Sequence, residues 1–507
     1  MTGTEKEIAT LEKKVICLTN ENLDLISKNQ ILYDENQALD KKYLDIKTKY
    51  NKVRKENRQY KDTIAKLSKN SGNSSKSPSS DIVKPPKKHL PKGKRKIGGQ
   101  PGHKKHERPL FAPSEVHDTF EYKLAECPTC QNGLDLVLGQ KPKIIQQIEI
   151  NKAPIEIEEH KAYAFWCDNC KKYHYADFPG HVVKAGMFKA RITATVAYMK
   201  NLCHCSFSTI RKYFRDILKI KVSRGYLSKV ISKVSNCLDA SYQELLNILP
   251  FTANVNVDET GHKENKVKFW TWVFKADLFV LFKIDKSRGS KVLIDVLGKE
   301  FNGVLGCDYF SSYRKYMKDF NVTIQFCIAH LIRDMRFLAA YPDEEIKKYG
   351  ELLLDQIREL FKTIHEKDQL QPDEFTEKLT RIKHKIIEIA INQAPSEIDD
   401  DGKELKRPAL NMANRFIKHG QAYFEFITSP QIEPTNNIAE QAIRFIVIDR
   451  YVTQGTRSIK GRKASERLWT VIATCALQGK SAFDFIVKSV EAYFHTEPYP
   501  SLIYDTS

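Results

Sequence analysis

The stretch NVNVDETG, residues 254–261, alternates polar and apolar side chains before it ends in two acidic residues. This pattern predicts a short β-strand, because successive side chains of a strand point to opposite faces of its sheet. Two further β-type runs follow in residues 268–276 and 278–285 and predict a hairpin. Residues 290–301 have the apolar spacing of an amphipathic helix. The sequence from residue 254 onward therefore predicts a mixed sheet with a helix on one face.

A second acidic strand end lies in GVLGCDYF, residues 303–310. A helix over SSYRKYMKDF and a fifth strand over VTIQFC, residues 322–327, complete the order β-β-β-α-β-α-β. This order matches the ribonuclease H-like core, in which the first and fourth strands are neighbours. We therefore expect Asp258 and Asp308 to face one another from adjacent strands.

The third acidic residue of interest is Glu440 in PTNNIAEQAIR, residues 434–444. Asn437, Glu440 and Arg444 share the polar face of a predicted helix, for which Asn436 or Asn437 is the candidate cap. The residues predicted to pack inward are Ala439, Ala442, Ile443 and Ile446. Taken alone, the helix would indicate only an exposed Glu–Arg pair. Three gathered carboxylates, however, can hold two Mg²⁺ or Mn²⁺ ions about 3.5–4 Å apart, a clamp for phosphodiester chemistry.

The charge of the chain favours a polyanionic partner. Its 507 residues include 82 Lys or Arg and 63 Asp or Glu, a net charge of +19. From Lys84 to Arg108 there are ten basic residues and one acidic residue, and Lys94, Arg95 and Lys96 form the densest run. Pro, Gly and charge prevent this segment from packing a core. The alternatives are an arm along DNA phosphates and a solvated tail, and we favour the arm.

The N-terminal segment carries nine consecutive heptads. The d positions are mostly Leu, and several a positions are Asn. Buried Asn pairs fix the register of parallel dimers at some cost in stability, so the pattern favours a dimeric coiled coil. The alternative is a long amphipathic helix that packs on its own chain. The a positions are Ile8, Val15, Asn22, Asn29, Asn36, Tyr43, Tyr50, Asn57 and Ile64, and the d positions are Leu11, Leu18, Leu25, Leu32, Leu39, Ile46, Val53, Tyr60 and Leu67.

Two C-x-x-C pairs predict a structural Zn²⁺ site. The pairs are Cys127 with Cys130 and Cys167 with Cys170, separated by 36 residues. Each pair can place two thiolates on one side of a tetrahedral metal, and four protein ligands leave no open position for chemistry. β-type runs in residues 144–150 and 160–166 would bring the pairs together as a zinc ribbon. Unrelated buried cysteines are the weaker alternative.

Residues 187–238 predict three short helices with a basic surface. Ser206 or Ser208 is a candidate cap for the second helix, and Ser223 for the third. The exposed Arg211 and Lys212 allow a helix-turn-helix DNA reader, but any small helical bundle with solvated lysines would have the same pattern. Residues 340–430 predict an all-α insertion before the closing helix.

Neither a signal-peptide core nor an apolar run of membrane-spanning length occurs, so we expect a cytoplasmic protein without membrane contact. The fold class predicted is multidomain α+β. Its predicted parts are a coiled coil (4–68), a flexible basic linker (69–110), a zinc-ribbon-like module (111–182), a helical DNA-binding region (183–250), the first part of an RNase H-like core (251–338), a helical insertion (339–430), and the catalytic Glu helix with C-terminal helices (431–507).

Over nearly its whole length the chain resembles the transposases of the insertion-sequence sixty-six family. The segments that carry the resemblance are GGQPGH (98–103), the two C-x-x-C pairs, VDETG (257–261), FWTWVF, GCDYFSSY, FCIAHLIRD, PTNNIAEQAIR and the block from Gln454 to Ile486. The combination is specific, although VDETG or C-x-x-C alone would not be. This family resemblance implies an RNase H-like DDE transposase with Asp258, Asp308 and Glu440 as its carboxylate triad.

The resemblance further implies a bacterial, nucleoid-associated enzyme that binds double-stranded DNA at the element ends and at the target. It would cleave and transfer strands with two Mg²⁺ or Mn²⁺ ions, as a homodimer through the coiled coil, with or without accessory proteins of the element. A nuclease that cuts without joining is a further alternative from the sequence. The remaining residues predicted to contact DNA are Arg444, Arg457, Lys460, Arg462 and Lys463, and a solvated basic loop is the alternative for the last four.

One position departs from the family pattern. The family usually has Glu-Arg where this chain has Glu440-Gln441. The absence of the family's Arg at position 441 leaves the triad intact. It keeps open a second interpretation, in which the chain is a catalytically decayed or purely regulatory DNA-binding protein. Cys327 and His330 match a C-x-x-H signature of several DDE families, and we favour a buried structural role for them over direct catalysis.

Overall fold

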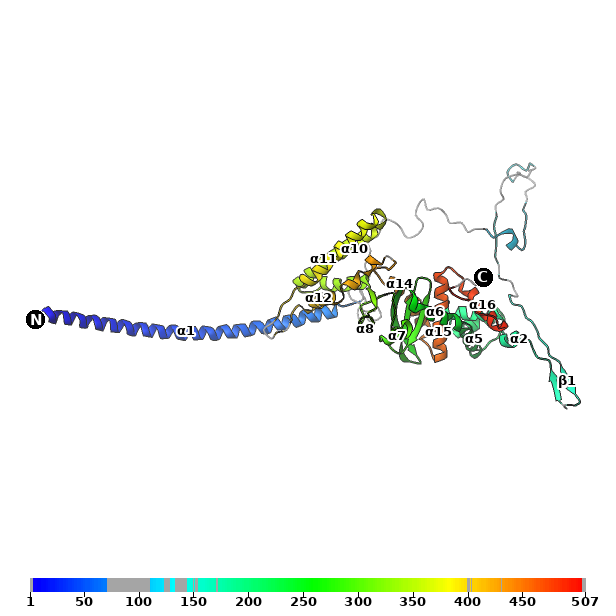
Figure 1. Cartoon of the computed structure of the whole chain (residues 1–507), viewed down its shortest axis with the longest axis horizontal. Helices are drawn as coiled ribbons and strands as arrows, with labels where there is room; N and C mark the ends of the chain where they lie inside the picture. The colour runs from blue at the N-terminus through cyan, green and yellow to red at the C-terminus, as the bar shows by residue number, and fades with distance from the viewer. Residues whose placement is uncertain are drawn as a thin grey trace.

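A computed structural model gives the structure of the chain, with a long helix at one end, a central sheet and a small hairpin at the other end (Figure 1). The structure is mixed α and β, as predicted. The structure describes residues 3–70, 110–122, 128–132, 144–148, 150, 154–169, 172–398, 402, 404–429 and 431–503.

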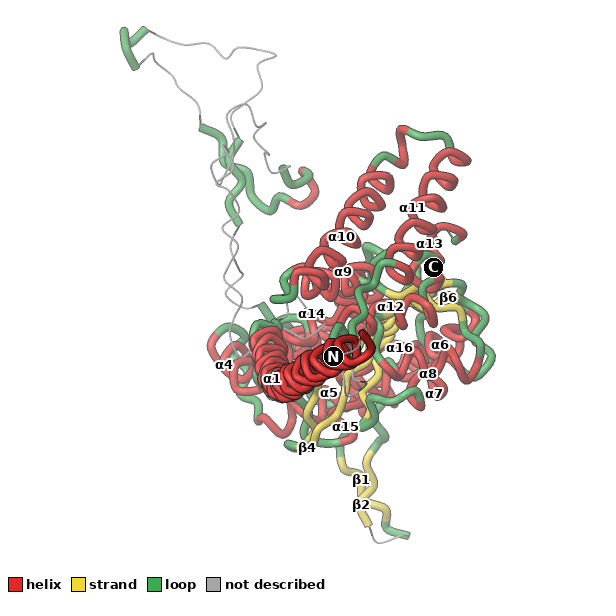
Figure 2. The backbone as a smooth tube through the Cα atoms, turned by 90° about the vertical axis from the view of Figure 1, so that its left-hand side faces the viewer, coloured by secondary structure: helices red, strands yellow, loops and turns green. Residues whose placement is uncertain are grey.

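The predicted N-terminal helix is confirmed as α1 (Gly3–Leu67), a single rod that projects from the body of the molecule (Figures 1 and 2). Its apolar a and d side chains are exposed along the whole length, from Ile8 at 56 % to Leu67 at 78 %. Within the part of the chain that the structure describes, α1 packs on its own chain only through the last turns, where Ala65 is buried. The alternative in which the whole helix lies on its own chain is therefore wrong.

The central sheet has five strands, which are β3 (Asn254–Glu264), β4 (Val267–Lys275), β5 (Val280–Asp285), β6 (Val304–Cys307) and β7 (Thr323–Phe326). Their order is β5-β4-β3-β6-β7. The first three strands are antiparallel, whereas β6 pairs in parallel with both β3 and β7. The predicted succession of strands and helices is observed, and the first and fourth strands of the sheet are neighbours as expected.

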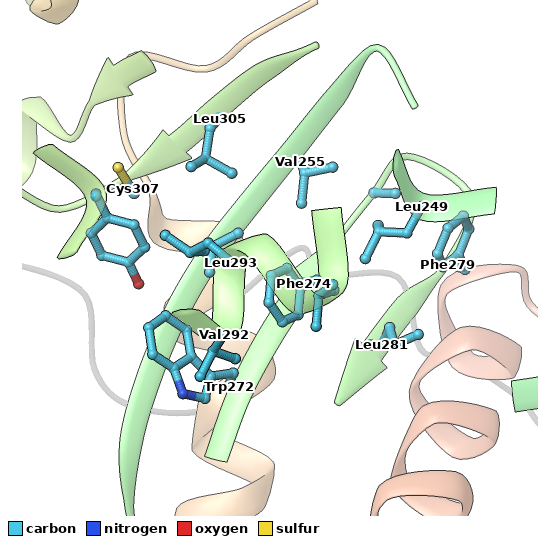
Figure 3. Packing of buried hydrophobic residues seen from close by; sticks show 14 of the residues in the cluster. Leu249, Val255, Trp272, Phe274, Phe279, Leu281, Val292, Leu293, Leu305 and Cys307 are labelled. Atoms are coloured by element: carbon cyan, nitrogen blue, oxygen red, sulfur yellow. The ribbon is translucent and has the colours of Figure 1, made fainter. Parts of the chain in front are cut away.

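One face of the sheet packs on α7 (Lys291–Leu297) and α8 (Ser311–Phe320). Val255, Trp272 and Leu305 point toward Leu293 of α7 in an apolar layer (Figure 3). The other face packs on α14 (Asn437–Thr453), where Val273 lies with Ala439 in a second apolar cluster. The sheet is therefore covered on both faces, which explains why its central strands are rich in buried side chains.

The edge strand β5 is covered by α15 (Ile459–Leu477). Three backbone N–H groups of the strand donate to three side chains spaced four residues apart on the helix. The pairs are Ile284 to Glu466 at 2.6 Å, Phe282 to Thr470 at 3.0 Å and Val280 to Thr474 at 3.1 Å. A free strand edge is a template for pairing with another chain, so this helix closes a surface that would otherwise promote aggregation.

The three helices predicted before the sheet are confirmed as α3 (Ala190–Asn201), α4 (Phe207–Asp216) and α5 (Arg224–Cys237). Two further helices, α2 (Gly180–Ala185) and α6 (Asp239–Ile248), flank them, and the C-terminal α16 (Ala482–His495) packs on α2, α3 and α5. Ser206 caps α4 by accepting from the Thr209 N–H at 3.0 Å, and Ser223 caps α5 by accepting from the Tyr226 N–H at 3.1 Å. The N-cap of α4 is therefore Ser206 and not the alternative candidate, Ser208.

The helix α9 (Ile328–Ala339) follows β7. The region predicted as a helical insertion then contains α10 (Glu344–His365), α11 (Pro372–Asn392), α12 (Arg407–His419) and α13 (Glu425–Thr428). Figure 1 shows α10 and α11 side by side as a pair that projects from the body. Single 3₁₀ turns occur at η2 (Pro113–Glu115), η3 (Leu249–Phe251), η4 (Lys367–Gln369) and η5 (Gln421–Tyr423).

In the predicted zinc module the structure describes one hairpin, β1 (Ala164–Cys167) paired with β2 (Lys172–Tyr175). The strand predicted over residues 144–150 is wrong for residues 144–148 and 150, which have no regular structure. Ile145 is 88 % exposed, and the described residues include no strand that pairs with this segment. Among the described residues, no helix is long and apolar enough to cross a membrane.

Candidate active site

Asp258 lies on β3 and faces α14. It is directly opposite Val273 of β4, and residues opposite each other in antiparallel strands point to the same face of the sheet. Val273 belongs to the cluster formed with α14. The polar residues of the alternating stretch, among them Asn256 and Asp258, therefore point toward α14, whereas Val255 and Val257 point toward the α7 side.

Asp308 follows the neighbouring strand at the matching position. Asn256 and Gly306 are the last paired residues of β3 and β6, and each aspartate lies two residues further on. The backbone N–H of Phe310 donates to Asp308 Oδ1 at 2.9 Å, and the N–H of Glu259 donates to Asp258 Oδ1 at 2.8 Å. The sequence prediction that adjacent strands carry these two acids is confirmed by the strand pairing.

Asn436 attaches the start of α14 to the sheet. Its amide Nδ2 donates to the Val257 carbonyl at 2.8 Å, and its Oδ1 accepts from Asn256 Nδ2 at 2.8 Å. Its backbone N–H donates to Cys327 Sγ at 3.1 Å. A side chain at Gly306 would meet this bridge, since a Cβ there would lie 2.3 Å from Asn256 Nδ2. Glu440 is one helical turn further along α14, so this bridge sets its distance from β3.

The side chain predicted to cap α14 therefore has a different role. Asn436 is the residue before the helix, but it makes no side-chain capping bond to the helix backbone. It is buried and bonds to β3 instead. The structural role favoured for Cys327 agrees with its buried thiol, which accepts the Asn436 N–H.

His330 and Arg333 of α9 flank Glu440. His330 Nε2 lies 3.7 Å and Arg333 Nη2 lies 3.6 Å from Glu440 Oε1. Burial, reinforced by the charge of Arg333, lowers the pKa of His330 below its ordinary value. Among the described residues, buried Glu440 Oε1 and His330 Nδ1 have no hydrogen-bond partner. Glu440 is therefore positioned by the charges around it and keeps an oxygen available for another ligand.

The acidic residues influence one another electrostatically. Burial raises the pKa of Asp258 well above its ordinary value, and the charges of Glu259, Asp308 and Glu440 add to the effect. Within the described residues, no group of three His, Cys, Asp or Glu side chains surrounds a common metal position. Even so, a hard divalent cation prefers oxygen ligands, and these crowded carboxylates include Glu440 Oε1, which accepts no hydrogen bond within the described residues.

Glu259 is a buried acid that the sequence prediction left without a role. It points to the opposite face of β3, where Arg288 Nε donates to its Oε1 at 2.8 Å and the Tyr313 hydroxyl donates to its Oε2. Burial, followed by the charge of Asp308, raises the pKa of Glu259 to about 7, although Tyr313 and Arg288 act in the opposite direction. The alternation of side chains along β3 could have identified this role, because it places Asp258 and Glu259 on opposite faces of the strand.

The residues predicted to bind DNA have different surroundings. Arg211 and Lys212 on α4 are exposed, as are Arg444 on α14 and its neighbour Gln441. Arg457, Lys460 and Lys463 are exposed around the start of α15. Arg462 is not, because it lies 3.6 Å from Glu264 Oε2 and covers the ring of Phe269. Lys94, Arg95 and Lys96 lie outside the described residues.

The predicted Zn²⁺ site also lies largely outside the described residues, which include neither Cys127 nor Cys170. Cys167 ends β1, and Cys130 is exposed in a turn. The site therefore remains a prediction.

The comparisons with known proteins identify the class. The pattern of the Transposase IS66 family matches residues 185–464, which is more than half of the chain and includes β3, β6 and α14. A family of unknown function (DUF6444) matches residues 24–109. No curated protein matches the chain. The class is thus that of the transposases. The chain belongs to the Transposase IS66 family, as the resemblance in its sequence implied.

Proposed function

We propose that this protein is a DNA transposase that binds the ends of its element, cleaves DNA strands there and transfers them to target DNA. The observation that carries the proposal is the placement of Asp258, Asp308 and Glu440. Two of them come from neighbouring strands at matching positions, and the third starts the helix bonded to the same strand. The strand order β5-β4-β3-β6-β7 supports the finer proposal of an RNase H-like core.

Asp258, Asp308 and Glu440 would hold two Mg²⁺ or Mn²⁺ ions. When bound, these ions supply Lewis-acid activation of a water or a 3′-hydroxyl and neutralise charge on the phosphodiester. The chain itself orients the carboxylates. Asn436 holds the helix of Glu440 on β3, and Glu259 links β3 to α8, the helix that follows Asp308.

The decisive experiment is a Mg²⁺-dependent cleavage and strand-transfer assay on DNA that flanks this gene. Asp308→Ala should lower strand cleavage by more than about 1,000-fold, because a metal clamp supplies several kcal/mol of transition-state stabilisation. Asp295→Ala is the matched control, since Asp295 is exposed on α7 away from the triad. Normal cutting by Asp308→Ala would refute the assignment.

The same assay separates the alternatives. Cleavage without joined products would favour a nuclease. Specific end binding without cleavage, even with Mn²⁺, would favour the decayed or regulatory protein or a need for accessory proteins of the element. Gln441 would then be the first residue to restore to Arg.

We further propose that α1 forms a parallel homodimer. Its a and d side chains are exposed, and its contacts with the body use other positions of the heptad. Arg54 pairs with Glu397, and Asp62 accepts from the Tyr341 hydroxyl at 2.6 Å, so the foot of α1 is attached through its b, e and f face. A single-chain mass in sedimentation at micromolar concentration would refute the dimer.

A structural Zn²⁺ at Cys127, Cys130, Cys167 and Cys170 completes the proposal. Metal analysis of the purified protein tests it, with about one zinc per chain expected and a zinc-free folded protein as the contrary result. Association with the nucleoid would follow from DNA binding.

A further inference from the structure

A cleft of about 350 Å³ opens between three helices on the side of α15 away from the triad. One wall is a polar stripe along α5, a second is the start of α15, and the third is α16. The lining residues are Ser228, Lys229, Ser232, Lys233, Asn236, Lys460 and Tyr493.

The lining has the composition of an anion site. It contains three ammonium groups and four neutral side chains that can donate hydrogen bonds, and no carboxylate. The acid closest in sequence to the α5 stripe, Asp239, is paired with Arg467. Lys460 also lies in the first turn of α15, where the helix dipole favours negative charge.

The three lysines are not equivalent. Lys233 donates to the carbonyls of Lys184 and Ala185 at 2.7 and 2.8 Å, so it is part of the wall that fixes α2. Lys229 and Lys460 are exposed, and within the described residues neither has an ion-pair partner. These two amines are therefore available to an incoming anion.

The strand β3 connects the triad with the start of α15. The backbone N–H of Thr456 donates to the Lys263 carbonyl near the end of β3, and Lys460 follows four residues later. Asp258 and Glu264 are six residues apart on the same strand, which corresponds to roughly 20 Å at about 3.3 Å per residue. The cleft itself lies on the neighbouring helices α5, α15 and α16.

We propose that this cleft binds backbone phosphates of double-stranded DNA at a distance from the bond that is cut. The inference rests on the proposed function, because it takes the DNA at the triad as the same duplex. Phosphate contacts of this kind fix the register of a protein on DNA without reading its sequence. The cleft would thus align the element end with Asp258 and Asp308.

The test is the salt dependence of binding to a random-sequence duplex of about 30 base pairs, measured by fluorescence anisotropy with full-length protein. Each phosphate contact contributes about 0.9 to the slope of log K against log salt concentration. Lys229→Ala combined with Lys460→Ala should therefore reduce the slope by about 1.8. The control pair Lys348→Ala and Lys385→Ala removes the same charge from exposed positions on α10 and α11.

An equal slope in the two double variants would overturn the proposal. Thermal unfolding of both variants verifies that they fold. The triad assay is independent: if Asp308→Ala abolishes cleavage while the slopes are equal, the cleft assignment fails and the proposed function stands.

Discussion

The neighbouring acidic residues Glu259 and Asp258 have opposite environments on the two faces of strand β3. Toward α8, Glu259 is buried and accepts hydrogen bonds from Arg288 and Tyr313. Toward α14, Asp258 lies with two further acids that raise its pKa, and no side chain donates a hydrogen bond to it within the described residues. A carboxylate that side chains of its own chain satisfy contributes to the fold, whereas a group of mutually repelling carboxylates that accept few hydrogen bonds is available for a ligand.

The contrast extends along the strand. The α14 face carries polar residues at every second position, Asn256, Asp258, Thr260 and His262, each in contact with its own chain or near another acid. The α7 face carries Val255 and Val257 before Glu259. The polar side chains of β3 therefore form a continuous row from the carboxylates to the neighbourhood of α15.

The largest effect on stability is expected from Glu259→Ala. The substitution would leave Arg288 and Tyr313 without their acceptor, and breaking a buried pair costs about 3–5 kcal/mol. Because the Arg288 side chain is 39 % exposed, water compensates it in part, and we expect a loss of about 3 kcal/mol. Urea unfolding measures the change, and Glu259→Gln should restore part of it.

The stability of Glu259→Ala tests this difference between the two faces of β3. Should Glu259→Ala unfold with the wild-type midpoint, Glu259 would not be a structural acid. Should it keep its stability but lose strand cleavage as completely as Asp258→Ala, it would belong with the triad instead.

A smaller effect is expected on the other face from Asp258→Asn. Without divalent ions the variant should be about 1 kcal/mol more stable than the wild type at neutral pH, because a repelled, buried carboxylate is removed. Mg²⁺ at about 100 times its Kd should stabilise the wild type by about 2.7 kcal/mol and leave the variant unchanged.

Thermal unfolding with and without Mg²⁺ makes both comparisons, with Asp295→Asn as the control. Equal Mg²⁺ stabilisation of the wild type and Asp258→Asn would place the ions elsewhere and remove the basis for the proposed triad.

The sequence predicted the arrangement of the acidic residues on the strands better than it predicted the long-range contacts of individual side chains. The alternation of residues 254–258 and the order of strands were sufficient to place Asp258 and Asp308 on adjacent strands. The partners of Glu259 lie 29 and 54 residues away on a loop and on α8, and a period of two cannot identify them. The local pattern before α14 indicated a capping Asn, but long-range bonds to β3 hold Asn436 instead.

The effect that depends on pH concerns His262, at the far end of the polar face. Its Nε2 lies 3.1 Å from Thr456 Oγ1, and burial, followed by the charges of Arg450 and Arg462, lowers its pKa from 6.5 to about 4. The unfolded chain thus takes up a proton between pH 6.5 and 4 that the folded chain does not, so this residue makes stability fall as the pH falls. From pH 7 to pH 5 its contribution should decrease by about 2 kcal/mol.

The raised pKa values of Asp258 and Glu259 act in the opposite direction, since they make stability fall as the pH rises. The measurement is therefore the difference between the wild type and His262→Gln, in which the common contributions cancel. Urea unfolding at pH 7 and pH 5 should show a smaller loss in the variant. An identical loss in both proteins would mean that His262 is protonated in the folded chain, and the polar face would then carry a positive charge near α15.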